Sequence, residues 1–317
     1  MSSVARQMAG IPAADLQSFT EHLKSCRRIV ALLGAGISAS SGLPTFRGAG
    51  GLWRSFDATS LATPGAFKSN PGLVWQFYSY RRHMALQADP NKAHYALAEL
   101  SRRNPDFITL SQNVDGAEHR LSQRAQHPAG QLHLLHGTLF DVKCTSFHCD
   151  YIRKDDYTDP LVPALDIPKK GMNFPSSAEK DSESDADAEP ELDISNAQVP
   201  IPDLTPADLP QCPKCNGLLR PGVVWFGESL PSDTLDFVDN WIDEEPVDLI
   251  MVIGTSSKVW PAASYLHTAR SAGARVAVIN MDANDLAGRN LEPGDWFFQG
   301  DAAVIVPEIL KSVIGEI

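Results

Sequence analysis

Four of the five cysteines in this 317-residue chain stand in two close pairs, Cys144 with Cys149 and Cys212 with Cys215. An intracellular chain with paired cysteines more often binds metal than forms disulfides. Four thiolates form a closed tetrahedral zinc site with no open position for catalysis, so the two pairs predict one structural zinc ion. His148 is an alternative ligand in place of Cys149, because the first pair lacks the two-residue spacing of the second.

A second group of chemistry-bearing residues follows the apolar run 29–33, where Gly34, Ala35, Gly36 and Ser38 stand close together. Residues 34–39 match the G-x-G-x-x-G/A pattern, in which glycines permit a tight turn and the approach of a pyrophosphate. A glycine turn in an α/β protein without a nucleotide has the same appearance. No strand-ending acid stands ~20 residues further on, where dehydrogenases hold the adenine ribose. This absence argues against hydride transfer.

Polar side chains also follow the next predicted strand, with Gln112, Asn113 and Asp115 just beyond its end. Parallel sheets bind ligands at this carboxyl edge, and amide and carboxylate groups can hold ribose hydroxyls or a carboxamide. A turn built on Asn and Asp side chains is the simpler alternative. His136 ends another apolar run, and an imidazole suits proton transfer near neutral pH.

Alternating apolar segments must position these residues. We expect strands at 29–33, 107–110, 223–226, 249–253 and 274–279, and helices at 13–26, 72–87, 92–102, 232–242 and 262–272. Short apolar strands alternating with helices predict an α/β fold with a parallel sheet.

The composition is globular, with 43% hydrophobic and 21% charged residues and a net charge of −12. Such an acidic chain is expected to bind neither nucleic acid directly nor membranes. We find no membrane-length apolar run and no signal peptide, and so expect a soluble intracellular protein. Residues 179–193 hold eight acids and one lysine, which is −7 of the −12, so the remaining chain carries only −5.

The acidic stretch also shapes the expected domain organisation. Residues 170–209 are rich in Ser, Asp, Glu and Pro and are expected to be a disordered insertion, because they offer little apolar surface to bury. They fall within a zinc-binding module at 138–220. The catalytic domain as a whole is expected to span 13–317, with its large part formed by 13–137 and 221–317, after a flexible terminus at 1–12.

Several of these motifs, taken in order, resemble those of the sirtuins, which are NAD-dependent protein-lysine deacylases. The matching segments are 34–38, 42–47, 112–115 and 136–137. The resemblance covers residues 25–305 except the acidic insertion. It implies a Rossmann-like parallel sheet domain with a small inserted zinc module and a helical lobe. NAD and an acyl-lysine protein or peptide would enter the cleft between them.

The resemblance also implies roles for individual residues. His136 would be the base that activates a ribose hydroxyl after nicotinamide leaves, with Asn113 and Asp115 as its catalytic partners. The peptide backbone would pair with the segment holding Val223, Trp225, Phe226 and Gly227. NAD would be held by Gly34, Ala35, Gly36, Ser38, Thr45, Phe46, Arg47, Trp53, Gln112, Asn113, Asp115, Gly254, Thr255, Ser256, Asn280 and Ala302.

Three further residues bear on the acyl group. Tyr78 and Arg81 stand three apart and so share one face of a predicted helix. They resemble the Tyr-x-x-Arg element of class III sirtuins, which prefer succinyl, malonyl and glutaryl lysine, and Ala62 resembles the residue that widens their pocket. An arginine is suited to a terminal carboxylate. The alternative for Arg81 is a solvated helix face.

Other functions share parts of this pattern. An ordinary deacetylase or a protein mono-ADP-ribosyltransferase would use the same NAD pocket, and a non-catalytic NAD-binding protein would retain only its binding residues. The resemblance implies a mitochondrial location, while the short stretch before the first helix leaves the cytoplasm or nucleus open.

Overall fold

Strand β1 (Ile29–Leu33) lies inside a parallel sheet, between β4 (Phe107–Ser111) and β9 (Leu249–Ile253). All five of its residues are apolar and buried, and they pack alternately into the cores on the two faces of the sheet. A continuous apolar strand buried on both faces is typical of a parallel sheet covered by helices. These positions come from a computed structural model, which describes residues 11–45, 51–114, 122, 124–169 and 191–317.

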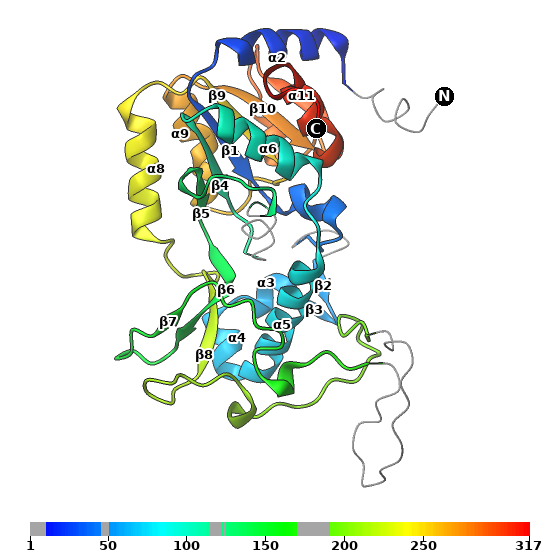
Figure 1. Ribbon diagram of the computed structural model, residues 1–317, viewed down its shortest axis with the longest axis vertical. Helices are drawn as coiled ribbons and strands as arrows, with labels where there is room; N and C mark the ends of the chain where they lie inside the picture. The colour runs from blue at the N-terminus through cyan, green and yellow to red at the C-terminus, as the bar shows by residue number, and fades with distance from the viewer. Residues whose placement is uncertain (1–10, 46–50, 115–121, 123, 170–190) are drawn as a thin grey trace.

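The sheet has six parallel strands in the order β11-β10-β9-β1-β4-β5. Its remaining strands are β5 (Leu132–Leu134), β10 (Arg275–Asn280) and β11 (Trp296–Gln299). One face is covered by α2 (Ala13–Ser25), α6 (Lys92–Arg103) and α11 (Ala302–Ile314). The other is covered by α8 (Ser232–Glu244) and α9 (Tyr265–Ser271) (Figure 1). Ala287 of α10 (Leu286–Arg289) packs into the core on this same face. The α/β prediction is therefore confirmed.

A smaller part lies beyond the carboxyl ends of these strands (Figure 1). Its antiparallel sheet has the order β7-β6-β8. Its strands and helices are β2 (Leu52–Trp53), β3 (Phe56–Asp57), α3 (Ala58–Leu61), α4 (Pro64–Ser69), α5 (Pro71–Gln87), β6 (Gly137–Cys144), β7 (Ile152–Arg153) and β8 (Leu219–Val223). One hydrophobic core joins the helices to this sheet, with Trp75 packed among Leu139 and Leu219. The cysteine-bearing sheet and the helical lobe thus share a single core.

The strand expected at 223–226 is displaced toward the N-terminus. The observed strand β8 begins at Leu219 and ends at Val223, so it shares only Val223 with the expected range. Its sequence includes Pro221 and Gly222, which disfavour an interior strand. β8 is an edge strand that pairs only with β6 in its sheet, and an edge tolerates proline. The apolar residues after Val223 instead leave the strand and enter the cleft described below.

The expected disordered insertion at 170–209 is wrong for its second half, since residues 191–209 pack against α5 and the β2–β3 turn. Arg54 donates to the carbonyls of Ile194, Asn196 and Ala197, and Tyr80 donates to Asp193. Partners distant in sequence therefore supply the ordering contacts that this polar segment lacks by itself. Residues 170–190 and the first ten residues of the expected flexible terminus lie outside the described part of the chain. None of the described helices is both long and apolar enough to cross a bilayer.

Candidate functional site

A cleft of about 810 Å³ runs along the carboxyl ends of the parallel strands and is closed on its other side by the smaller part. Of the residues predicted from the sequence, it is lined by Gly34, Ala35, Gly36, Thr45, Ala62, Tyr78, Gln112, Asn113, His136, Trp225, Phe226, Gly227, Gly254, Thr255, Ser256, Asn280 and Ala302. The structure therefore brings most of the predicted residues to one place.

Two glycine turns meet at the floor of the cleft. Gly34 and Gly36 donate from their N–H groups to the carbonyls of Ile253 and Gly254, each at 2.9 Å. A Cβ on Gly36 would lie 2.7 Å from Gly254 Cα, and one on Gly254 would lie 2.5 Å from the nitrogen of Ile37. Side chains cannot fit at such separations. The 3-10 helix η2 (Ala35–Ser41) continues from this turn, and the N–H groups of Gly34 and Gly36 are used to join the two turns.

Two amides follow β4 and cross to the glycine turns. Asn113 is buried and donates from Nδ2 to the carbonyl of Gly34 at 3.1 Å, while Gln112 Nε2 lies 3.3 Å from Thr255 Oγ1. The simple Asn/Asp turn considered above therefore does not describe them, because their side chains reach other elements. Asp115, expected beside them, lies outside the described residues.

A hydrogen bond to the backbone fixes the tautomer of the His136 imidazole. Nδ1 lies 2.6 Å from the backbone carbonyl of Gln112, and a carbonyl can only accept a hydrogen bond. The proton must therefore be on Nδ1, which leaves Nε2 as a proton acceptor. Burial lowers the pKa of His136 below its usual 6.5, against the opposing effect of the bond to Gln112. The ring is thus neutral at physiological pH and suited to act as a general base.

The opposite end of the cleft is formed by residues after β9, β10 and β11. Asn280, the last residue of β10, donates from Nδ2 to the carbonyl of Thr255 at 3.0 Å. Ala302 is the first residue of α11 and stands at the same edge. Three neighbouring strands therefore end in the groups that were expected to hold the adenosine half of NAD.

The wall formed by the smaller part is aromatic. Trp225 Nε1 donates to the hydroxyl of Tyr78 at 3.0 Å, and both side chains are almost wholly buried. The ring of Phe67 lies 5.2 Å from that of Trp225. Ala62 adds little volume at this wall, and its carbonyl accepts from the N–H of Phe226 at 3.0 Å. An apolar chain entering here would meet the phenol of Tyr78.

Arg81 is buried one turn beyond Tyr78 on α5 and is not among the residues that line the cleft. Its Nη2 donates to the carbonyl of Pro44 at 3.3 Å, and its guanidinium carbon lies 5.5 Å from the ring centre of Phe77. The solvated helix face considered above is therefore wrong, since only 4% of the residue is exposed. Its role toward a substrate carboxylate stays a prediction.

Three other predicted residues do not line the cleft. Ser38 is buried with Oγ 3.5 Å from His94 Nε2, and Trp53 packs edge-on against Phe77 in the core of the smaller part. Val223 ends β8, where it pairs with Gly137. Phe46 and Arg47 lie outside the described residues.

Three N–H groups of the segment expected to receive the peptide are already bonded. Those of Val224 and Phe226 donate to the carbonyls of His136 and Ala62, and that of Trp225 donates to the Glu228 carboxylate. Other groups of the segment would have to receive a peptide main chain. The expected peptide pairing stays a prediction.

Sequence reasoning missed several cleft residues in the loops after β9, β10 and β11. Lys258 and Trp260 follow β9, Asp282 and Asp285 follow β10, and Asp301 follows β11. The signal that could have found them is position alone, because polar residues just after parallel strands share one edge. Lys258 lies 3.6 Å from Asp285, whereas Asp301 caps α11 through the N–H of Ala303.

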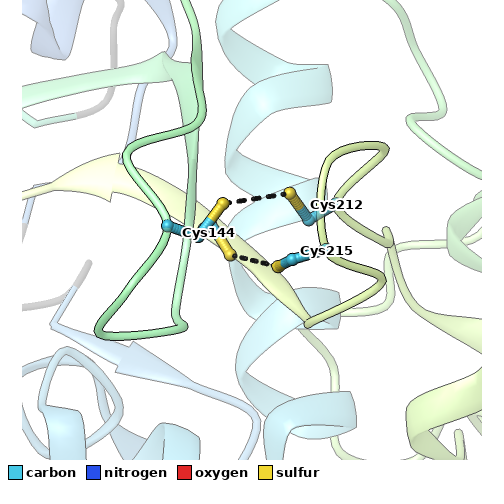
Figure 2. Close-up of side chains that lie close together, drawn as sticks. Cys144, Cys212 and Cys215 are labelled. Carbon is cyan, nitrogen blue, oxygen red and sulfur yellow. Dashed lines mark hydrogen bonds between the residues drawn. The ribbon is translucent and has the colours of Figure 1, made fainter.

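The four paired cysteines form a second site within the smaller part. All four Sγ atoms lie within 4.8 Å of one another, with Cys144 3.4 Å from Cys215 and Cys149 3.7 Å from Cys212. Figure 2 shows Cys144 facing the loop that carries Cys212 and Cys215. Tetrahedral Zn–S bonds of ~2.3 Å require sulfurs ~3.8 Å apart, so this donor set fits zinc. The cluster contains Cys149 and not His148, whose side chain is exposed and packs edge-on against Phe147.

Comparison with known proteins gives one consistent family. The model of the Sir2 family matches residues 34–261. An NAD-dependent protein deacylase of Candida albicans is 47% identical over 307 residues, covering 96% of this chain and 99% of the relative. The mitochondrial NAD-dependent protein deacylase sirtuin-5 of Danio rerio is 39% identical over 308 residues, covering 95% of this chain and 88% of the relative.

Solved structures agree with the sequence comparison. The crystal structure of a Sir2 homologue in complex with NAD is similar with a TM-score of 0.70 at 33% identity. The match covers 95% of this chain and 93% of that chain, so the similarity includes both sides of the cleft.

Proposed function

The chain belongs to the Sir2 family, and we propose that it is an NAD-dependent deacylase of acyl-lysine in proteins and peptides. The observation that carries this proposal is the neutral imidazole of His136, with Nε2 available as a base, in the same cleft as the glycine turns. When bound, NAD supplies the ADP-ribose that accepts the acyl group, with release of nicotinamide.

The two glycine turns would form the floor on which the dinucleotide lies, since Gly34, Gly36 and Gly254 let the two turns pack closely against each other. The amides of Gln112 and Asn113 would orient the ribose nearest His136. Nε2 of His136 would take a proton from a hydroxyl of that ribose, and the bond from Nδ1 to Gln112 stabilises the imidazolium that results. Phe46, Arg47 and Asp115 stay assigned to this half of the site by resemblance.

The four cysteines would hold a zinc ion that closes the smaller part without taking part in the reaction, because they fill all four positions of a tetrahedral site. The ion would join the loop after β6 to the Cys212–Cys215 turn. It would thereby support the core that positions Tyr78 and Trp225.

The experiment that tests this function measures the products. Purified protein with NAD and an acyl-lysine peptide should release nicotinamide, free-lysine peptide and O-acyl-ADP-ribose in equal amounts. A peptide or protein carrying covalent ADP-ribose would support a mono-ADP-ribosyltransferase instead, and reduced NAD would support a dehydrogenase.

For the acyl group, we propose succinyl, malonyl or glutaryl lysine, recognised by Tyr78 and Arg81 at the aromatic wall. Two observations support this proposal. Arg81 lies one turn from Tyr78 on α5, and the small residue Ala62 lines the cleft together with Tyr78. The guanidinium would have to leave the carbonyl of Pro44 and turn toward the cleft as the carboxylate arrives. A charge-assisted, bidentate contact is stronger than the bond to a neutral carbonyl that it replaces.

A pair of variants tests this acyl preference. Arg81→Met should lower kcat/KM for a succinyl-lysine peptide by at least about tenfold and leave acetyl-lysine nearly unchanged. Arg103→Met, at an exposed arginine of α6 paired with Glu99, is the matched control and should alter neither rate. An Arg81→Met enzyme that still prefers succinyl-lysine would contradict the proposal.

We also propose a mitochondrial location, because the Danio rerio relative carries that location in its name. Imaging of the full chain with a carboxyl-terminal fluorescent tag tests this, and a cytoplasmic or nuclear signal would contradict it.

A further inference from the structure

The cleft has an acidic end. The described residues there include three carboxylates, Asp282, Asp285 and Asp301, against the single ammonium group of Lys258. All four stand in the loops that follow β9, β10 and β11. A dinucleotide carries negative charge on its phosphates, which carboxylates repel. The three carboxylates at this end of the cleft therefore need an explanation other than electrostatic attraction of the dinucleotide.

Strand order indicates which half of the dinucleotide lies there. The glycine turn follows β1 in the middle of the sheet, and Asn113 and His136 stand on the β4–β5 side of it. If the diphosphate lies on the turn and the reacting ribose lies beside His136, the other nucleoside must lie on the β9–β10 side. The adenosine ribose would then face Asn280 and its neighbours.

Asp285 is the carboxylate held directly against Asn280. Its Oδ2 accepts from Asn280 Nδ2 at 3.1 Å, and its Oδ1 lies 3.6 Å from Lys258 Nζ. It precedes α10 but does not cap that helix with its side chain. Its carboxylate is therefore positioned by groups of the cleft and not by its own helix.

Each of the two other carboxylates accepts a hydrogen bond within its own turn. Asp282 accepts from the N–H of Asn284 at 2.8 Å, and Asp301 accepts from the N–H of Ala303 at 2.9 Å. Asp301 also accepts from the hydroxyl of Ser40. Neither is bonded to Asn280, so Asp285 is the acid best placed to act on the ribose.

We propose that Asp285 selects NAD over NADP. The proposal rests on the proposed function and assigns the residue that discriminates its co-substrate. In dinucleotide-binding folds a carboxylate favours a free ribose 2′-hydroxyl, whereas an arginine accommodates a 2′-phosphate. A 2′-phosphate adds nearly two negative charges, which Asp285 would repel. The acid that the sequence lacks ~20 residues after the glycine turn is thus supplied from the loop after β10.

Binding of ADP-ribose and of 2′-phospho-ADP-ribose by titration calorimetry tests this without requiring catalysis. The wild-type protein should prefer ADP-ribose. Asp285→Asn keeps an oxygen for Asn280 Nδ2 and leaves Lys258 beside the site, so it should reduce that preference at least about tenfold, through tighter 2′-phospho-ADP-ribose binding. Asp243→Asn removes an exposed carboxylate from α8, outside the cleft, and is the matched control.

The outcomes separate the two proposals. A preference unchanged in Asp285→Asn, or changed equally in Asp243→Asn, overturns the assignment of Asp285 while leaving the deacylase proposal intact. Failure of the wild-type protein to bind ADP-ribose at all overturns the proposed function. A reduced preference confined to Asp285→Asn supports the inference.

Discussion

The two sides of the cleft are built in different ways. The side formed by the parallel sheet consists of glycine turns and polar residues that directly follow strands, such as Gly34 after β1 and Asn280 at the end of β10. The aromatic wall consists of side chains that meet across the chain, as when Trp225 donates to Tyr78, 147 residues away. The sheet side depends on backbone geometry, and the wall depends on tertiary packing.

This difference predicts which property a substitution on each side of the cleft should change. A change on the sheet side should affect dinucleotide binding or the reacting groups, because the glycine turns and the proposed base His136 lie there. A change in the smaller part should act through stability or through the choice of acyl group. The following predictions test that division, beginning with the largest expected effect.

His136→Ala should lower kcat by about 10²- to 10⁴-fold, because the variant lacks the base at Nε2. The melting temperature and ADP-ribose affinity should stay near those of the wild type, since the backbone carbonyl of His136 still accepts from Val224. Turnover, thermal unfolding and calorimetry measure the three quantities.

His133→Ala is the matched control for that change, because His133 stacks on Phe237 at a ring distance of 4.4 Å and does not line the cleft. It should keep kcat within about threefold. Substantial activity in His136→Ala would remove His136 from its assigned role.

Cys212→Ser should abolish zinc binding and destabilise the smaller part by more than about 2 kcal/mol, because Cys212 is fully buried in the shared core beside the other three thiols. Metal analysis and thermal unfolding measure both effects. Cys26→Ser, at a thiol on the far side of the sheet domain, should keep one zinc per chain. A Cys212→Ser protein that still holds one zinc would contradict the four-cysteine site.

Gly254→Ala should weaken ADP-ribose binding at least about tenfold, since the new Cβ would lie 2.5 Å from the nitrogen of Ile37 and force the two glycine turns apart. Gly273→Ala is the control that introduces backbone strain without crowding of neighbouring atoms. Gly273 has φ of +104°, yet the nearest atom to its Cβ would be 3.7 Å away. It should lose stability without losing ADP-ribose affinity, and equal affinity losses in both variants would contradict the account.

The smallest expected effect is on pH dependence. The base must be neutral to accept a proton, and burial holds the pKa of His136 below 6.5. The rate should therefore fall as pH decreases through this lowered pKa, with the acid limb of kcat/KM centred below pH 6.5 and a plateau above it. A limb centred above pH 6.5 would show that another group, or a raised histidine pKa, controls the step.

Much of the sheet domain could be predicted because its signals are local. The apolar run 29–33 and the turn 34–36 define strand and turn within eight residues, and the structure places both where the sequence indicated. β8 could not be placed, because Pro221 and Gly222 are acceptable only at the edge that β8 occupies. Likewise, nothing within 191–209 reveals that Arg54 would bind its carbonyls.

In the candidate site too, features with local sequence signals could be predicted, and contacts between distant segments could not. Residues directly after strands, such as Asn113, could be found from position, and the four cysteines could be found from spacing. The contact of Arg81 with the carbonyl of Pro44 and that of Asp285 with Asn280 depend on side-chain directions across separate loops. Such contacts follow from packing, which local sequence patterns do not encode.

The most direct test of the account compares acyl groups in the wild-type protein. One peptide carrying either succinyl-lysine or acetyl-lysine is assayed with and without NAD, and kcat/KM is measured for each. We predict turnover only with NAD and a kcat/KM for succinyl-lysine more than about tenfold above that for acetyl-lysine. Equal rates for the two peptides, or turnover without NAD, would contradict the account.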